Sequence, residues 1–155
     1  MSIRRATLED VPSLMAITDE SVSAGHWTEK QYQSALTDTL PRRVLLVFTD
    51  LNTIRGFVVA AEIAREWELE NIAVRNSGRR QGTADQLMEA LLKELQSSRA
   101  ECLHLEVRES NTAARTLYEK WGFRVSGRRT RYYHNPSEDA ILYRKNLSPA
   151  APEIR

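Results

Sequence analysis

One glutamate and one tyrosine have the chemical character and the surroundings to move protons. Glu106 alternates with leucines in the segment Cys102–Arg108, so its side chain shares a face of the expected strand with His104. Tyr118 falls in a stretch with helical spacing, and a phenol with an ordinary pKa of about 10 keeps its proton at neutral pH. Glu106 can therefore accept a proton, directly or through water, and Tyr118 can donate one. A surface ion pair for Glu106 and helix packing for Tyr118 are the structural alternatives.

A turn rich in glycine and arginine precedes the longest expected helix and could hold phosphate groups. The sequence Arg79-Arg80-Gln81-Gly82-Thr83-Ala84 lies between an apolar strand pattern and this helix. The first turn of a helix has backbone N–H groups without intrahelical partners and the positive end of the helix dipole, so a pyrophosphate can bind there. Gly82 and Ala84 let the backbone approach the phosphates, and the arginines add forked donors. The spacing matches neither the Walker nor the dinucleotide glycine pattern, and a solvated basic loop is the alternative.

Hydrophobic periodicity predicts the elements that must position these groups. Strand patterns cover residues 3–6, 44–48, 54–63, 66–74, 102–108, 123–129 and 140–147. Helical patterns cover residues 8–22, 28–39, 82–98 and 111–121. The three strands that end at residue 74 suggest an antiparallel meander, and the strand–helix–strand order that follows requires a crossover, which makes a parallel pair. We therefore predict an α/β (α+β) domain with a mixed central sheet of six to seven strands, flanked by about four helices.

Composition and charge fit a single globular domain. Residues 1–147 are expected to form this domain, and the polar, proline-bearing segment 148–155 is expected to be a flexible tail. The formal net charge of +1 gives no reason to expect nucleic acid or a membrane as a partner. The sequence has no signal-peptide or membrane-spanning pattern, so we expect a cytoplasmic protein. The single cysteine, Cys102, excludes an intrachain disulfide framework, and the three histidines lack metal-ligand spacing, so no metal is expected.

The phosphate turn and its neighbours resemble those of one enzyme family. The spacing Arg79-x-x-Gly82-x-Ala84 resembles the Q/R-x-x-G-x-G/A signature of the GNAT acetyltransferases. The segment Trp27-Thr28-Glu29-Lys30 is similar to a Pro-Trp-Ser-Glu segment of the members that acetylate protein N-termini, among them the bacterial ribosomal-protein alanine N-acetyltransferases. Other segments match at the corresponding places: Ile72-Ala73-Val74, Leu105-Glu106-Val107-Arg108, Ser110-Asn111 and Trp121-Gly122-Phe123. The resemblance covers about residues 2–147.

This resemblance implies the GNAT fold, acetyl-CoA as the co-substrate without a metal, and a role for each segment. Backbone groups of Ile72, Ala73 and Val74 would bind the pantetheine arm as an added strand would, and Asn111 would hydrogen-bond the same arm. Glu106 matches the family's general base and Tyr118 its general acid. The main-chain N–H groups of the turn would surround the pyrophosphate, so the cofactor-binding turn comprises Arg79, Arg80, Gln81, Gly82, Thr83, Ala84 and Asp85. Asp85 departs from the family's pattern, because it places a negative charge close to the phosphates.

The resemblance also predicts the acceptor, which is the N-terminal amine of a protein or peptide, with a ribosomal protein as one candidate. An α-amino group has a pKa of about 8, against about 10.4 for lysine, so one carboxylate suffices to deprotonate it. Glu68, and Glu70 with the same parity, are alternatives to Glu106, since many GNAT enzymes place the base on this earlier strand. Tyr132 and Tyr133 could line a peptide groove or simply pack on their strand. Small-molecule amines as acceptors, and a non-catalytic module that binds acetyl-CoA, are the other functions left open.

Overall fold

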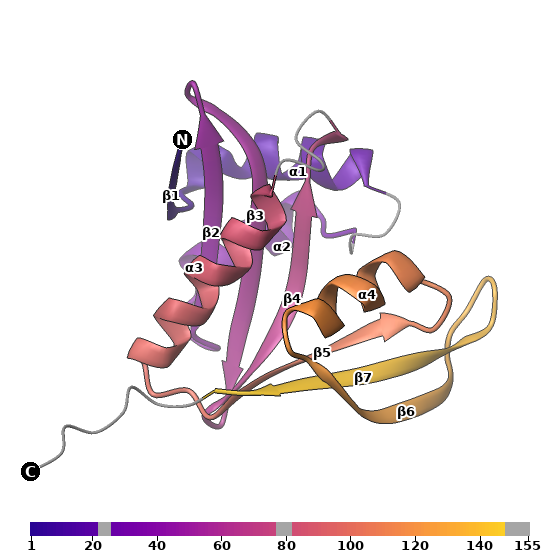
Figure 1. The fold of residues 1–155 in the computed structure, drawn as a ribbon. Helices are drawn as coiled ribbons and strands as arrows, with labels where there is room; N and C mark the ends of the chain where they lie inside the picture. The colour runs from indigo at the N-terminus through magenta and orange to yellow at the C-terminus, as the bar shows by residue number, and fades with distance from the viewer. Residues whose placement is uncertain (22–25, 77–81, 148–155) are drawn as a thin grey trace, which may run out of the picture.

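The computed structural model describes residues 1–21, 26–76 and 82–147, and Figure 1 shows their arrangement. The predicted tail 148–155 lies outside the described residues, as do Arg79, Arg80 and Gln81 of the predicted phosphate turn. The described strands are β1 (Ser2–Arg5), β2 (Arg43–Asp50), β3 (Thr53–Ile63), β4 (Glu66–Val74), β5 (Cys102–Arg108), β6 (Arg124–Tyr133) and β7 (Glu138–Asn146). The helices are a 3-10 turn (Leu8–Asp10), α1 (Val11–Glu20), α2 (Glu29–Thr37), α3 (Thr83–Ser97) and α4 (Thr112–Lys120).

The described strands form one mixed sheet in the order β1-β2-β3-β4-β5-β7-β6. The pairs β1–β2, β2–β3 and β3–β4 are antiparallel, and the last two confirm the predicted meander. The only parallel pair in this sheet is β4 with β5, which are joined by the crossover through α3, and β7 returns antiparallel beside β5 with β6 outside it. The seven strands and four α-helices confirm the predicted fold class.

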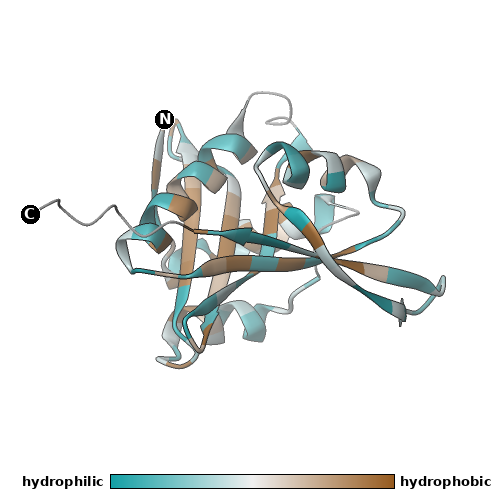
Figure 2. Ribbon diagram, turned by 60° about the horizontal axis from the view of Figure 1, so that its bottom comes forward, coloured by the Kyte–Doolittle hydropathy of each residue, from teal (hydrophilic) through white to brown (hydrophobic). Residues whose placement is uncertain are grey.

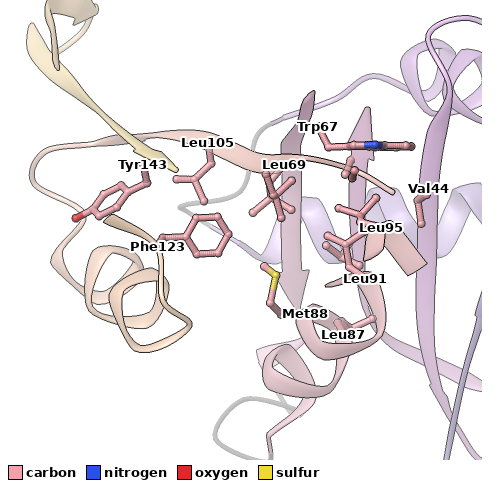
Figure 3. Packing of buried hydrophobic residues seen from close by; sticks show 14 of the residues in the cluster. Val44, Trp67, Leu69, Leu87, Met88, Leu91, Leu95, Leu105, Phe123 and Tyr143 are labelled. Carbon is pink, nitrogen blue, oxygen red and sulfur yellow. The ribbon is translucent and has the colours of Figure 1, made fainter. Parts of the chain in front are cut away.

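Two apolar layers cover the two faces of the sheet. On one face, α3 presents Leu87, Leu91 and Leu95 to the strands, together with Trp67 of β4, as Figure 3 shows. On the other face, Tyr32 of α2 joins side chains of α1 in a second buried cluster. Figure 2 shows hydrophobic residues concentrated on the strands in the middle of the sheet. Removing these large apolar side chains from water is the main favourable contribution to folding.

Local sequence explains where the helices begin, and pairing between strands explains where the boundaries differ from those predicted. Thr28 caps α2 by accepting a hydrogen bond from the Gln31 N–H, and Oε1 of Gln31 accepts one from the Thr28 N–H, so the helix starts one residue later than expected. Asn111 caps α4 by accepting a hydrogen bond from the Ala114 N–H, rather than forming the first turn of the helix. β6 continues to Tyr133, beyond the predicted end at residue 129, because it pairs with β7 through two register shifts.

The parallel pair is short. β4 and β5 are paired over Glu66–Glu68 and Cys102–His104, and Figure 1 shows the two strands diverging beyond this point. β4 also contains a bulge: Val59 of β3 lies opposite Asn71, and Ala60 lies opposite Leu69, which leaves Glu70 as the extra residue. A bulge bends its strand and re-aims the side chain at that position. The two halves of the sheet therefore separate along β4 and β5.

Gly56 on β3 allows the start of α3 to lie directly on the sheet. A Cβ atom at this position would stand 2.9 Å from the Ala73 carbonyl oxygen and 3.3 Å from Cγ2 of Thr83. Because a backbone oxygen cannot move aside as a flexible side chain can, only glycine fits here without a shift of β4 or α3. The N-terminus of α3 is thereby held beside the diverging end of β4.

We expect Gly56→Ala to lower the free energy of unfolding by about 1–3 kcal/mol, the usual cost of overpacking a well-packed interior. Chemical denaturation followed by circular dichroism measures this change. Gly127→Ala is the matched control, because its new Cβ would meet the movable Cδ1 of Leu142 at 3.2 Å instead of a backbone atom. Equal losses of stability in the two variants would contradict the proposed role of Gly56.

Candidate active site

A cleft of about 710 Å³ opens where β4 and β5 diverge, and α4 forms one of its walls. Ile72 and Val74 line it from β4, Leu105 and Val107 from β5, and Tyr118 from α4. The cleft also brings together predicted site residues that lie far apart in the chain. Those that line it are Ile72, Ala73, Val74, Ala84, Glu106, Asn111 and Tyr118.

The start of α3 has the properties of an anion-binding helix terminus. Its N-cap, Gly82, has a left-handed φ of 76° and offers no side-chain cap to the first N–H groups of the helix. A Cβ at Gly82 would meet no atom within 4 Å, so the space beside this backbone is open. Thr83 is buried against the sheet, so only its main chain could serve a ligand. This region fits a pyrophosphate bound by backbone N–H groups.

Asp85, also predicted in the phosphate turn, directs its carboxylate away from that turn, toward the end of α4. Its Oδ1 accepts a hydrogen bond of 2.7 Å from the indole N–H of Trp121, and Lys120 lies 3.2 Å from Oδ2. These partners, the indole N–H first, lower the pKa of Asp85. The Asp85 side chain therefore ties α3 to α4, and its charge is partly neutralised close to the expected phosphates.

Asn111 stands at the mouth of the cleft with half of its amide engaged. Its Oδ1 accepts a hydrogen bond of 3.2 Å from the Ala114 N–H, which caps α4. The Asn111 NH₂ group is therefore the part of this side chain suited to a ligand, and it can donate to a carbonyl of the expected pantetheine arm.

Two of the three candidate bases, Glu106 and Glu70, line the cleft, whereas Glu68 lies in the paired part of the strands opposite His104. The Oε1 of Glu106 is 3.0 Å from Nε of Arg129, and the Glu106 side chain is 25% exposed. The Glu70 carboxylate is bound by Arg43. The geometry favours Glu106 and Glu70 over Glu68 for contact with a ligand in the cleft.

Glu68 has a different environment from the other two. Burial raises its pKa, and the negative charges of Glu106 and Glu70 add to this rise, while nearby His104 opposes it. Three carboxylates therefore interact on the face of the sheet opposite α3, and burial disfavours the ionised form of Glu68.

Tyr118 sits in an aromatic cluster at the base of the cleft. Its ring packs against Trp121, Phe123 and Tyr143 at centroid distances of 6.0, 5.8 and 6.3 Å. Burial raises the pKa of Tyr118 to about 12, so the phenol stays protonated throughout the physiological range. Tyr118 lines the cleft, so the proton that it retains can be donated to a group bound there.

The β6–β7 hairpin contributes two tyrosines, for which the sequence allowed either a place in a peptide groove or packing on the strand. Tyr133 lines the cleft, and the guanidinium of Arg108 stacks on its ring at 4.2 Å. Arg108 also pairs with Glu138 at the start of β7. Tyr132 is largely exposed beside Tyr133, with ring centroids 5.2 Å apart. The stack of Arg108 on Tyr133 was not predicted, because β7 pairs with both β5 and β6 and so brings together residues 25 positions apart, which leaves no local signal.

The burial of the cysteine and the spacing of possible metal ligands limit two other kinds of chemistry, thiol nucleophilic attack and metal binding. Cys102 is buried and donates its S–H to Glu66, and burial raises its pKa to about 11. Its thiol therefore stays protonated and is a poor nucleophile. Among residues 1–21, 26–76 and 82–147, no group of three or more histidine, cysteine or acidic side chains is placed to hold a metal ion. In the same residues, no helix is long and apolar enough to cross a membrane.

Known proteins share both the sequence and the architecture of this chain. The family model described as the Acetyltransferase (GNAT) family matches residues 11–123. The [ribosomal protein bS18]-alanine N-acetyltransferase of Escherichia coli strain K12 is 34% identical over 135 residues, which are 86% of this chain and 88% of that protein. The crystal structure of the Escherichia coli ribosomal-protein-S18-alanine N-acetyltransferase superposes with a TM-score of 0.86 at 31% identity, over 99% of this chain and 98% of the other. Ard1 from Thermoplasma volcanium superposes with the same TM-score at 26% identity, over 95% and 97% of the two chains.

We expect Glu68→Gln to stabilise the protein at neutral pH. The folded-state pKa of Glu68 is above the usual carboxyl value of about 4.3, so folding disfavours the ionised form, and stability falls as the pH rises through this range. The gain should disappear below about pH 4, where Glu68 is protonated in both states. Thermal unfolding of the variant and the wild-type protein across this pH range measures the gain in stability, and Glu62→Gln is the control on β3. A loss of stability at pH 7 in Glu68→Gln would contradict this account.

Proposed function

Since the chain belongs to the acetyltransferase (GNAT) family and is an N-acetyltransferase, we propose that it acetylates the N-terminal amine of a protein, with acetyl-CoA as donor. The observation on which this proposal rests most is the cleft between β4 and β5. It joins an anion-binding helix terminus, a carboxylate and a protonated tyrosine along a single cavity. We propose further that the substrate is a ribosomal protein beginning with alanine, as the names of the relatives state for theirs.

The residues at the cleft suit the parts of acetyl-CoA. Main-chain N–H groups at Gly82–Asp85 would hold the pyrophosphate at the start of α3, where no side-chain cap competes. Ile72–Val74 would bind the pantetheine arm along the diverging edge of β4, and the Asn111 amide would donate to it from α4. Arg79, Arg80 and Gln81 remain proposed phosphate ligands from outside the described residues. When bound, acetyl-CoA supplies an activated thioester at the end of this arm.

Glu106 is the proposed general base. It lines the cleft from the end of β5, where its carboxylate is beside Arg129 but still partly exposed. An N-terminal amine with a pKa of about 8 is only moderately basic, so a carboxylate can take its proton directly or through a water molecule. Glu70 also lines the cleft, but Arg43 binds both of its oxygens, and Glu68 lies deeper in the paired strands. These positions support Glu106 over the two alternatives.

Tyr118 is the proposed general acid. Its phenol, with a pKa of about 12, holds a proton on the side of the cleft that α4 lines and can give it to the departing sulfur as the amide bond forms. The aromatic side chains around it fix the ring, so the proton is presented from a defined position. Glu106 on β5 and Tyr118 on α4 thus lie on different walls of one cavity, as transfer of an acetyl group between two bound molecules requires.

We expect the purified protein to release CoA thiol with peptides that have a free N-terminus, most rapidly with those that begin with alanine. Mass spectrometry should place the acetyl group on the α-amine, and N-blocked peptides that contain lysine should not react. Thiol release with small amines alone would contradict the protein substrate and assign the cleft to small-molecule acceptors. Binding of acetyl-CoA without transfer to any of these amines would contradict an acetyltransferase of peptides.

Glu106→Gln and Tyr118→Phe should each lower kcat by about 100-fold or more, the usual contribution of a general base or acid. The affinity for acetyl-CoA should change little, because both substitutions keep the shape of the side chain. Glu62→Gln is a control that removes an acidic group from β3, away from the cleft. If Glu106→Gln kept full kcat and Glu70→Gln or Glu68→Gln lost most of its kcat, the general base would be a glutamate of β4 and not Glu106.

A further inference from the structure

An ion pair joins the first residue of β2 to the bulge of β4, where Glu70 lines the cleft. Nε of Arg43 is 2.8 Å from Oε1 of Glu70, and Nη2 is 3.4 Å from Oε2. The two side chains are 18% and 20% exposed, so this pair is much less solvated than a surface salt bridge. Glu70 lines the cleft, and Arg43 reaches the cleft through Glu70 rather than lining it.

The Arg43 guanidinium also contacts the segment that leads into α2. Its central carbon lies 5.8 Å from the centroid of the Trp27 ring, within the range of a cation–π interaction. The Trp27 ring packs on Tyr32 at 5.3 Å, and Tyr32 packs edge-on against Phe57 of β3 at 5.9 Å. Arg43 therefore connects the bulge of β4 to the buried core beneath α1 and α2.

Residues at both ends of this connection reach the cleft. His26, next to Trp27 in the chain, lines the cleft, as does Ser21 at the end of α1. Glu70 lines it from β4, where the bulge sets the direction of its side chain. One wall of the cleft is thus built from two segments that are distant in sequence, and Arg43 bridges them.

The charges in this region explain why an arginine suits position 43 better than a lysine. Glu70 is close enough to Glu68 to raise the pKa of Glu68, so these carboxylates repel each other. The guanidinium neutralises Glu70 through two N–H groups and at the same time offers a flat cation to Trp27. A lysine could supply the charge but not the fork or the flat surface.

We propose that Arg43 is a positioning residue for the acceptor, which holds Glu70 and the segment at His26–Trp27 together as one rigid wall of the acceptor site. This inference rests on the proposed N-terminal acetylation. It predicts that loss of Arg43 weakens peptide binding selectively, because the guanidinium binds Glu70 and lies over Trp27, whereas the start of α3 and residues Ile72–Val74 would bind acetyl-CoA.

The test compares Arg43→Ala with its neighbour Arg42→Ala in steady-state kinetics. Arg42 is a matched control: it pairs with Glu62 at 3.5 Å and stacks over Trp67 at 5.6 Å, but it does not line the cleft. We expect Arg43→Ala to raise KM for an alanine-initiated peptide roughly tenfold, equivalent to about 1.4 kcal/mol, with KM for acetyl-CoA unchanged. Arg43→Lys should show a smaller rise, and Arg42→Ala should leave both KM values at the wild-type level.

A double-mutant cycle separates positioning from a general loss of structure. If Arg43 acts through Glu70, the variant with both Arg43→Ala and Glu70→Ala should have a peptide KM close to that of the worse single variant. If Arg43→Ala does not fold, Arg43→Lys and Glu70→Gln give the same comparison with smaller changes. Thermal unfolding of every variant shows whether stability follows KM.

Three results would overturn the inference. An unchanged peptide KM in Arg43→Ala, from a wild-type protein that acetylates peptides, removes the positioning role and leaves the proposed function intact. An equal rise in KM for peptide and for acetyl-CoA shows a general disturbance of the cleft. Failure of the wild-type protein to acetylate any peptide removes the proposed function, and the acceptor role of Arg43 with it.

Discussion

The shortness of the parallel pairing between β4 and β5 is the constraint on which the rest of the site depends. Three residues on each strand are paired, and beyond them the strands separate. Parallel strands normally exchange evenly spaced hydrogen bonds along their length, and a cleft of this kind cannot exist where they do. The bulge at Glu70 bends β4 at the start of this separation, and Gly56 lets the start of α3 lie against the end of the same strand.

The two sides of the diverging strands have different chemistry. Toward α3 and α4 the cleft ends at an uncapped helix terminus and an aromatic cluster around Tyr118, which suit an anionic cofactor and a protonated acid. On the opposite face three glutamates interact, and arginines neutralise two of them, Glu70 through Arg43 and Glu106 through Arg129. A cofactor and an amine can therefore approach one point from opposite faces of the sheet.

The sequence predicted most elements of the fold because each element follows from the residue pattern of its own segment. The bounds of β4 and β5 agree with the alternation of apolar residues, and the helices follow their leucine spacing and capping residues. The bulge was not predicted, since the adjacent polar residues Glu70 and Asn71 interrupt the alternation without specifying an extra residue in the strand. The same limit applies to contacts such as Asp85 with Trp121 and Arg43 with Glu70, which depend on elements brought together only by the complete fold. Proposed roles for Glu106, Tyr118 and Asn111 came from family resemblance, and the cleft adds that these residues share one cavity.

The most direct test of the central claim is a crystal structure of the protein with a conjugate in which CoA is joined through an acetyl bridge to the α-amine of an alanine-initiated peptide. The account predicts that the conjugate passes through the cleft between β4 and β5. Its pantetheine arm should lie along Ile72–Val74, and its junction should lie between Glu106 and Tyr118. A junction bound outside this cleft, or beside Glu68 in the paired part of the strands, would contradict the account.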